Sequence, residues 1–191
     1  MNNIEISPLI RNRWSPRIYS QQTISESDIL KLFEAARWAA SSSNSQPWRF
    51  IYANRGDVDQ WPKLFDCLTD FNKVWVDKAP FLALSLVQKI NIKSGAYQRH
   101  SWYDLGLAVG NLTYQASSMG IYLRNMAGFD QGKAILNFNI PDLFEPVVMF
   151  TFGFPGEAEN QNSNFLFPTK ENRIRRDLSQ LIFKGDWEIL K

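Results

Sequence analysis

A helix with a distinct start and stop, followed at once by a strand, most constrains what this chain can fold into. Residues 25–39 repeat apolar side chains at three- and four-residue intervals, which predicts one buried helical face. Ser25 is a suitable start, because a serine side chain accepts a hydrogen bond from the first turn. The polar run 41–45 and Pro47 end the helix, since Ser and Asn compete for backbone hydrogen bonds and proline lacks an N–H. Residues 48–53 then read as a strand.

Further helices and strands are predicted along the rest of the chain. Apolar side chains at helical spacing indicate a second helix over 101–119, and short apolar runs predict strands over 81–87, 121–123 and 147–152. The run 147–152 is almost wholly apolar, so we expect it in the centre of a sheet. The elements alternate without regular βαβ spacing, which predicts an α+β fold. We expect the 191 residues to form a single domain.

Composition excludes several classes of protein. Lys and Arg number 21 against 19 acidic residues, a balance that predicts neither nucleic-acid binding nor attachment to anionic lipid. The lone Cys67 leaves no internal disulfide and fits a reducing compartment, and the lone His100 argues against a zinc site. The longest apolar stretch, 79–87, is far shorter than a membrane helix, and residues 1–10 lack a signal-peptide pattern. We therefore expect a cytoplasmic protein without membrane or nucleic-acid partners.

Two groups of arginines near the chain ends are candidate anion ligands. Arg13 and Arg17 flank Ser15, and Arg173 and Arg175 lie in the tail. Guanidinium groups match phosphate oxygens in pairs, and a hydroxyl adds a further donor. The chain has no glycine-rich phosphate loop, so a nucleotide phosphate would depend on such side chains. Taken alone, the two groups are more simply explained as solvated charge.

The polar segment 40–48, ASSSNSQPW, is a third candidate. Its hydroxyl and amide groups supply the donors and acceptors that recognise a flat heterocycle. The alternative interpretation is a turn that ends the preceding helix.

The chain lacks the motifs of a serine hydrolase. It contains no G-x-S-x-G elbow, and its single histidine leaves little scope for a Ser-His-Asp triad.

Taken together and in order, the short motifs of this chain resemble those of the FMN-dependent nitroreductase family. They are RWSPR at 13–17, SSSNSQPWRF at 41–50, NKVWVDKAP at 72–80, YDLGLAVG at 103–110, MAGFD at 126–130, FGFP at 152–155 and RIRRDLSQL at 173–181. Each motif is short, but the ordered series covers nearly the whole chain. The resemblance implies a mixed, mainly antiparallel sheet flanked by helices. It also implies a homodimer in which a C-terminal arm, 165–191, packs on the partner subunit.

The resemblance further implies FMN as the cofactor and assigns the residues that bind it. These are Arg13, Trp14, Ser15, Arg17, Ser41, Ser42, Asn44, Gln46, Asn72, Asn125, Ala127, Gly128, Arg173 and Arg175. The members near the two chain ends hold the phosphate and ribityl chain, and those in 41–46 reach the flavin from the second subunit. Asn72 meets the polar edge of the flavin, and the members in 125–128 lie beside its reactive nitrogen. Ala127 stands where one branch has an acid, and Trp75 where it has a lysine.

The implied activity is that of an NAD(P)H oxidoreductase. FMN accepts a hydride from NADH or NADPH and passes it, by a ping-pong mechanism, to a nitroaromatic, a quinone or a related small-molecule acceptor. The flavin carries this chemistry, so we expect no obligatory catalytic side chain and no metal. Two alternatives remain open: a flavin-binding carrier or sensor without turnover, and a specialised flavin branch such as a reductive dehalogenase.

Overall fold

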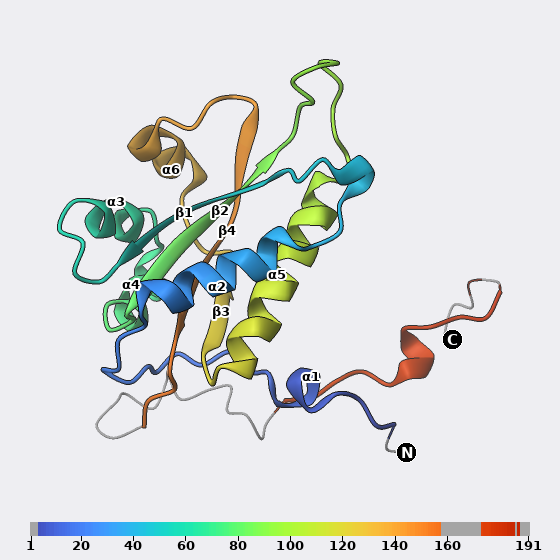
Figure 1. Cartoon of the computed structure of the whole chain (residues 1–191), viewed down its shortest axis with the longest axis horizontal. Coiled ribbons are helices and arrows are strands. Elements are labelled where there is room, and N and C mark those ends of the chain that lie inside the picture. Colours follow the sequence, from blue (N-terminus) through green and yellow to red (C-terminus); the bar gives the residue numbers. More distant parts are fainter. Residues whose placement is uncertain (1–3, 158–172, 186, 188–191) are drawn as a thin grey trace.

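The centre of the fold is an antiparallel sheet with the strand order β1-β2-β4-β3 (Figure 1). The computed structural model describes residues 4–157, 173–185 and 187. The strands are β1 (Trp48–Asn54), β2 (Phe81–Gln88), β3 (Tyr122–Met126) and β4 (Phe144–Gly153). Every neighbouring pair of these strands is antiparallel. The α+β class is confirmed, and β4, which contains the apolar run 147–152, lies inside the sheet as predicted.

Helices cover both faces of this sheet. The long helices α2 (Glu26–Arg37) and α5 (Ser101–Ser118) pack together on one face. Shorter helices, α3 (Gln60–Asp66), α4 (Asp70–Val76) and α6 (Gln131–Phe138), cover the other face. A further short helix, α1 (Pro8–Asn12), lies against α5 (Figure 1).

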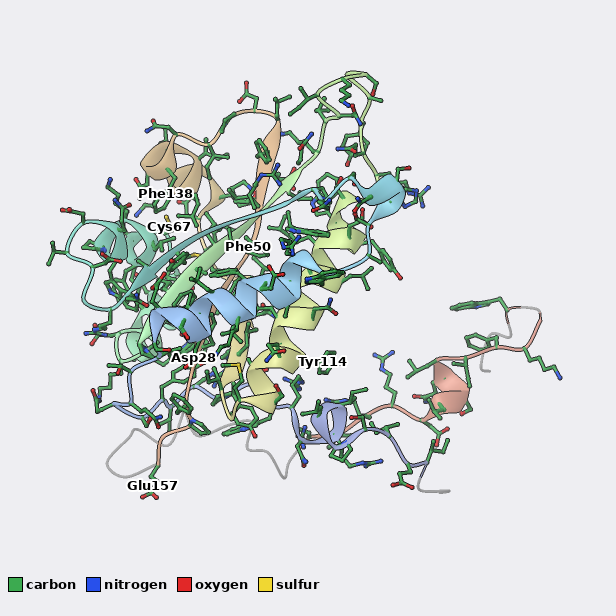
Figure 2. The ribbon with its side chains drawn as sticks, viewed as in Figure 1. Asp28, Phe50, Cys67, Tyr114, Phe138 and Glu157 are labelled. Carbon is green, nitrogen blue, oxygen red and sulfur yellow. The ribbon has the colours of Figure 1, made fainter. Side chains whose placement is uncertain are left out.

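The strand β2 supplies both cores, which explains its apolar composition. Phe81 and Ala83 are buried beneath α2 and α5, whereas Leu82 and Leu84 are buried beneath the shorter helices. The Phe81 ring stacks on Phe152 of β4, with 3.7 Å between the ring centroids. Figure 2 labels Phe50 on β1, which packs against the core beneath α2 and α5. It also labels Cys67, in the core beneath the shorter helices, and Phe138, which packs against that core.

The predicted helices form with small differences at their ends. The Ser25 hydroxyl caps α2 by accepting from the Asp28 N–H at 3.1 Å. The helix ends at Arg37, two residues before the predicted end, and α5 matches its predicted range to within one residue. The four short helices were not predicted, because none exceeds eight residues and two turns give little periodicity to detect.

The described part of the C-terminal segment, 173–185, extends past α1 and away from the sheet (Figure 1). Ile174, Leu181 and Ile182 are exposed there in the single chain. The rest of the expected arm, 165–172, 186 and 188–191, lies outside the described residues. Among the helices described, none is both long and apolar enough to cross a membrane.

Candidate functional site

A cavity of about 440 Å³ runs along α5, between this helix and strands β3 and β4. Its lining consists of Arg13, Ser15, Trp102, Leu105, Gly106, Val109, Gly110, Thr113, Tyr114, Leu123, Asn125, Val147 and Val148. The walls are mostly apolar, with a few polar groups, as is usual for small-molecule sites of this volume. A second cavity, of about 550 Å³, lies between the turns around Asn54 and Lys78 and contains none of the predicted site residues.

The N-terminal segment that contains three predicted phosphate ligands lies beside the edge strand β3. The Trp14 ring meets Tyr122 of β3 edge-on, at 6.1 Å between centroids. Arg124, also on β3, donates from Nη1 to the Ser15 carbonyl at 2.6 Å. Arg13 donates from Nη1 to the Ser15 hydroxyl at 2.9 Å. These contacts hold Arg13 and Ser15 together at one end of the cavity.

Arginines from both ends of the chain meet at this point. Arg173 donates from Nη1 to the Arg13 carbonyl. Partial burial lowers the pKa of Arg13, and the positive charges of Arg173 and Arg175 lower it further. Arginines separated by about 160 residues in the sequence therefore lie together, and their like charges repel. We call Arg13, Arg173 and Arg175 the Arg13 cluster. An anion bound among them would relieve that repulsion.

Arg124 is a neighbour of the site that sequence analysis did not predict. Burial lowers its pKa, and the nearby positive charge of Arg17 lowers it further. Its guanidinium lies over the Trp75 ring, and that of Arg17 over the Phe71 ring, each at 5.4 Å from the centroid. The sequence feature that could have pointed to Arg124 is its charge, because the rest of the run 121–126 is uncharged.

A second group of predicted residues meets at the turn after β3. The Gly128 carbonyl accepts from Asn72 Nδ2 at 2.8 Å, and from Thr69 Oγ1 and N at 3.2 Å each. Asn72 is buried, and its Oδ1 accepts from Trp75 Nε1 at 3.2 Å. A Cβ at position 128 would lie 2.9 Å from Asn72 Nδ2, so a larger residue there would displace the Asn72 amide. We call Thr69, Asn72 and Gly128 the Gly128 clamp.

The remaining predicted residues, in 41–46, lie beside the start of α5. The Ser42 N–H donates to the buried Asp104 carboxylate at 3.1 Å. Ser43, Asn44 and Gln46 all have positive φ, of 50°, 53° and 47°, a conformation that costs non-glycine residues of the order of 1 kcal/mol each. Figure 1 places α1, just before Arg13, near the other end of α5. One chain therefore does not bring this segment to the Arg13 cluster, and its contribution to a second subunit's site stays a prediction.

Known proteins are similar to this chain in sequence. The family described as "Nitroreductase family" matches residues 10–154. A curated relative from Archaeoglobus fulgidus, named provisionally as an NADH dehydrogenase/NAD(P)H nitroreductase, is 31% identical over 118 residues. That alignment covers 61% of this chain and 64% of the relative, so it spans less than two thirds of the relative's length.

Solved structures match almost the whole chain. A structure described as an oxidoreductase containing FMN is 26% identical, with a TM-score of 0.88, and the match covers 98% of this chain and 96% of the other. A nitroreductase family protein from Clostridium difficile 630 is 19% identical, with a TM-score of 0.75, and covers 96% and 100%, which shows a common fold. The family match extends from before Arg13 through β4 and includes the Gly128 clamp. This chain therefore belongs to the nitroreductase family.

Proposed function

We propose that this protein is an FMN-dependent oxidoreductase that takes electrons from NADH or NADPH and reduces a small-molecule acceptor by a ping-pong mechanism. Nitroaromatics and quinones are the acceptors we expect. The observation that carries the proposal is the meeting of Arg13, Arg173 and Arg175 beside Ser15 at one end of the cavity. The similar solved structure described as containing FMN supports the choice of cofactor.

The residues present fit FMN in charge and in shape. A terminal phosphate is a dianion with several acceptor oxygens, and the Arg13 cluster with the Ser15 hydroxyl supplies matching cations and donors. The apolar cavity walls and Asn125 suit a flat ring with polar edges.

Bound FMN supplies the two-electron redox chemistry. The chain has to bind the cofactor, orient it and stabilise negative charge on it. The positive charge of Arg17 lowers the pKa of Arg124, so these two side chains together favour an anionic group at their surface. This proposal assigns no proton transfer to a side chain of this protein.

We also propose that the protein acts as a homodimer. Tyr103, Leu107 and Tyr114 are exposed along one face of α5, and Figure 2 marks Tyr114 on this helix. The C-terminal segment exposes further apolar residues outside the body of the fold. A second copy that covers both surfaces would remove this apolar area from water. It would also bring the 41–46 segment of each subunit to the flavin site of the other.

A visible absorption spectrum tests the proposed function. The purified protein is reconstituted with FMN, freed of excess cofactor, and then titrated anaerobically with NADPH and, separately, NADH. We expect about one FMN bound per chain, with loss of the oxidised-flavin absorption after addition of one or both donors. Binding without reduction by either donor would replace the proposal by a carrier or a specialised flavin branch. Absence of FMN binding would refute it.

A further inference from the structure

The Gly128 clamp is part of a wider attachment between two turns. Besides the three hydrogen bonds on the Gly128 carbonyl, the Asp130 N–H donates to the Cys67 carbonyl at 2.7 Å. Leu68 and Phe129 form an isolated antiparallel bridge between the same two turns. The turn after β3 is therefore fixed, at both of its ends, to the connection between α3 and α4.

This attachment fixes the peptide unit that joins Ala127 to Gly128. The Ala127 carbonyl accepts from the Phe129 N–H at 3.1 Å, and the next carbonyl, that of Gly128, is held by the clamp. A trans peptide directs its N–H opposite to its carbonyl, so fixing these carbonyls also fixes the direction of the Gly128 N–H.

The Gly128 N–H itself is available for a ligand. Within residues 4–157, 173–185 and 187, it donates to no acceptor. Backbone donors in folded proteins are nearly always satisfied by protein, water or ligand. Gly128 is only partly buried, and it lies three residues after Asn125, which lines the cavity along α5.

We propose that Thr69 is a positioning residue for the flavin: together with Asn72, it holds the Gly128 peptide so that the Gly128 N–H donates to the cofactor's ring system. The proposal rests on the proposed function and adds to it a residue that acts through the Gly128 peptide. A donor fixed in advance needs no reorganisation when the ligand binds, and this is the advantage that the clamp provides.

Thr69→Val tests this role, because it removes the hydroxyl donor and keeps nearly the same shape. Thr69→Ser keeps the hydroxyl, and Thr23→Val, at an exposed threonine in the loop before α2, is the matched control. Two quantities are measured for each protein: the FMN dissociation constant, and the protection of the Gly128 amide from hydrogen exchange, by NMR, with and without FMN.

In the unmodified protein, we expect FMN to slow exchange of the Gly128 amide. Thr69→Val should lose most of this protection and bind FMN roughly two- to tenfold more weakly, the range for one hydrogen bond. Thr69→Ser and Thr23→Val should behave as the unmodified protein. The affinity for inorganic phosphate should be unchanged in all three variants, since phosphate tests the Arg13 cluster.

The outcomes separate this inference from the proposed function. If the unmodified protein binds FMN but Thr69→Val retains full amide protection and affinity, the positioning role is wrong and the proposed function stands. Weakened phosphate binding in Thr69→Val would also overturn the inference, because the change would then reflect general damage. If the unmodified protein does not bind FMN, the proposed function fails, and the inference fails with it.

Discussion

The Gly128 clamp and the Arg13 cluster, which we call the two ends of the candidate site, are stabilised in opposite ways. At the Gly128 clamp, the buried Asn72 amide and the Trp75 indole N–H are paired with groups of the protein itself. At the Arg13 cluster, the like charges of Arg173 and Arg175 lower the pKa of Arg13. The hydrogen bonds on the Gly128 carbonyl are formed without a ligand. The Arg13 cluster contains repulsion that a bound anion would relieve.

The direction of the pKa shifts gives this contrast a thermodynamic sign. Burial lowers the pKa of Arg13 and of Arg124, and neighbouring arginines lower both further. A lowered pKa of a cation means that its charged form is less favourable in the folded chain than in the unfolded chain. The charges at this end therefore oppose folding at neutral pH, whereas the hydrogen bonds of the clamp favour it.

The largest effect is expected from removing a charge of the Arg13 cluster. Arg13→Ala should raise the FMN dissociation constant roughly 10- to 100-fold, because a hydrogen bond to a charged group contributes about 1.5–3 kcal/mol. The affinity for riboflavin, which lacks the phosphate, should change little. Fluorescence titration with both flavins measures this, with the exposed Arg37→Ala as control. Equal losses for FMN and riboflavin would contradict a phosphate role for Arg13.

At the other end, a substitution should affect the protein before any ligand is added. Asn72→Leu leaves the buried Trp75 Nε1–H without its acceptor and removes one donor from the Gly128 carbonyl. We expect the free energy of unfolding of the ligand-free protein to fall by about 1–3 kcal/mol. Urea denaturation tests this, with Asn111→Ala as the exposed control. A ligand-free protein as stable as the unmodified one would remove the contrast between the two ends.

Inorganic phosphate alone should stabilise the charged end. At a concentration ten times its dissociation constant, a ligand specific for the folded state adds about 1.4 kcal/mol to the free energy of unfolding. We expect phosphate to raise the melting temperature of the ligand-free protein more than chloride does at equal ionic strength. Arg13→Ala should abolish the difference. A difference of the same size in Arg13→Ala would place the anion elsewhere.

The two ends also differ in how far they could be predicted from the sequence. The Arg13 cluster was found through the family resemblance, because its members stand in recognisable motifs and their charge marks them. Arg124 and Thr69 stand in no quoted motif of the binding site. Their roles depend on tertiary contacts, with the Ser15 carbonyl and the Gly128 carbonyl respectively.

The same distinction holds for the fold. The helices α2 and α5 have enough turns for an apolar period to appear, and the chemistry of Ser25 marks the start of α2. The short helices α3 and α4 are stabilised mainly by the core they share with β2, so their local sequence carries little signal. The contact between Asn72 and the flavin stays a prediction. The side-chain oxygen of Asn72 and one of its amide hydrogens already form hydrogen bonds within the protein.

The smallest effect expected is at Cys67, whose reactivity reports on the clamp end alone. Its thiol is buried, and this burial raises its pKa, so little thiolate is present near neutral pH. Its carbonyl accepts from Asp130, and its Sγ lies against the Lys63 carbonyl and the Asn137 amide, so we expect the thiol to become accessible when α3, α6 and the two turns separate. We expect slow reaction with a disulfide reagent at pH 8, faster reaction in Asn72→Leu, and full reactivity in urea. Saturating FMN should change the rate by less than about twofold, because this end is already formed before FMN binds. Strong protection by FMN would show that the clamp, like the Arg13 cluster, is completed only by its ligand.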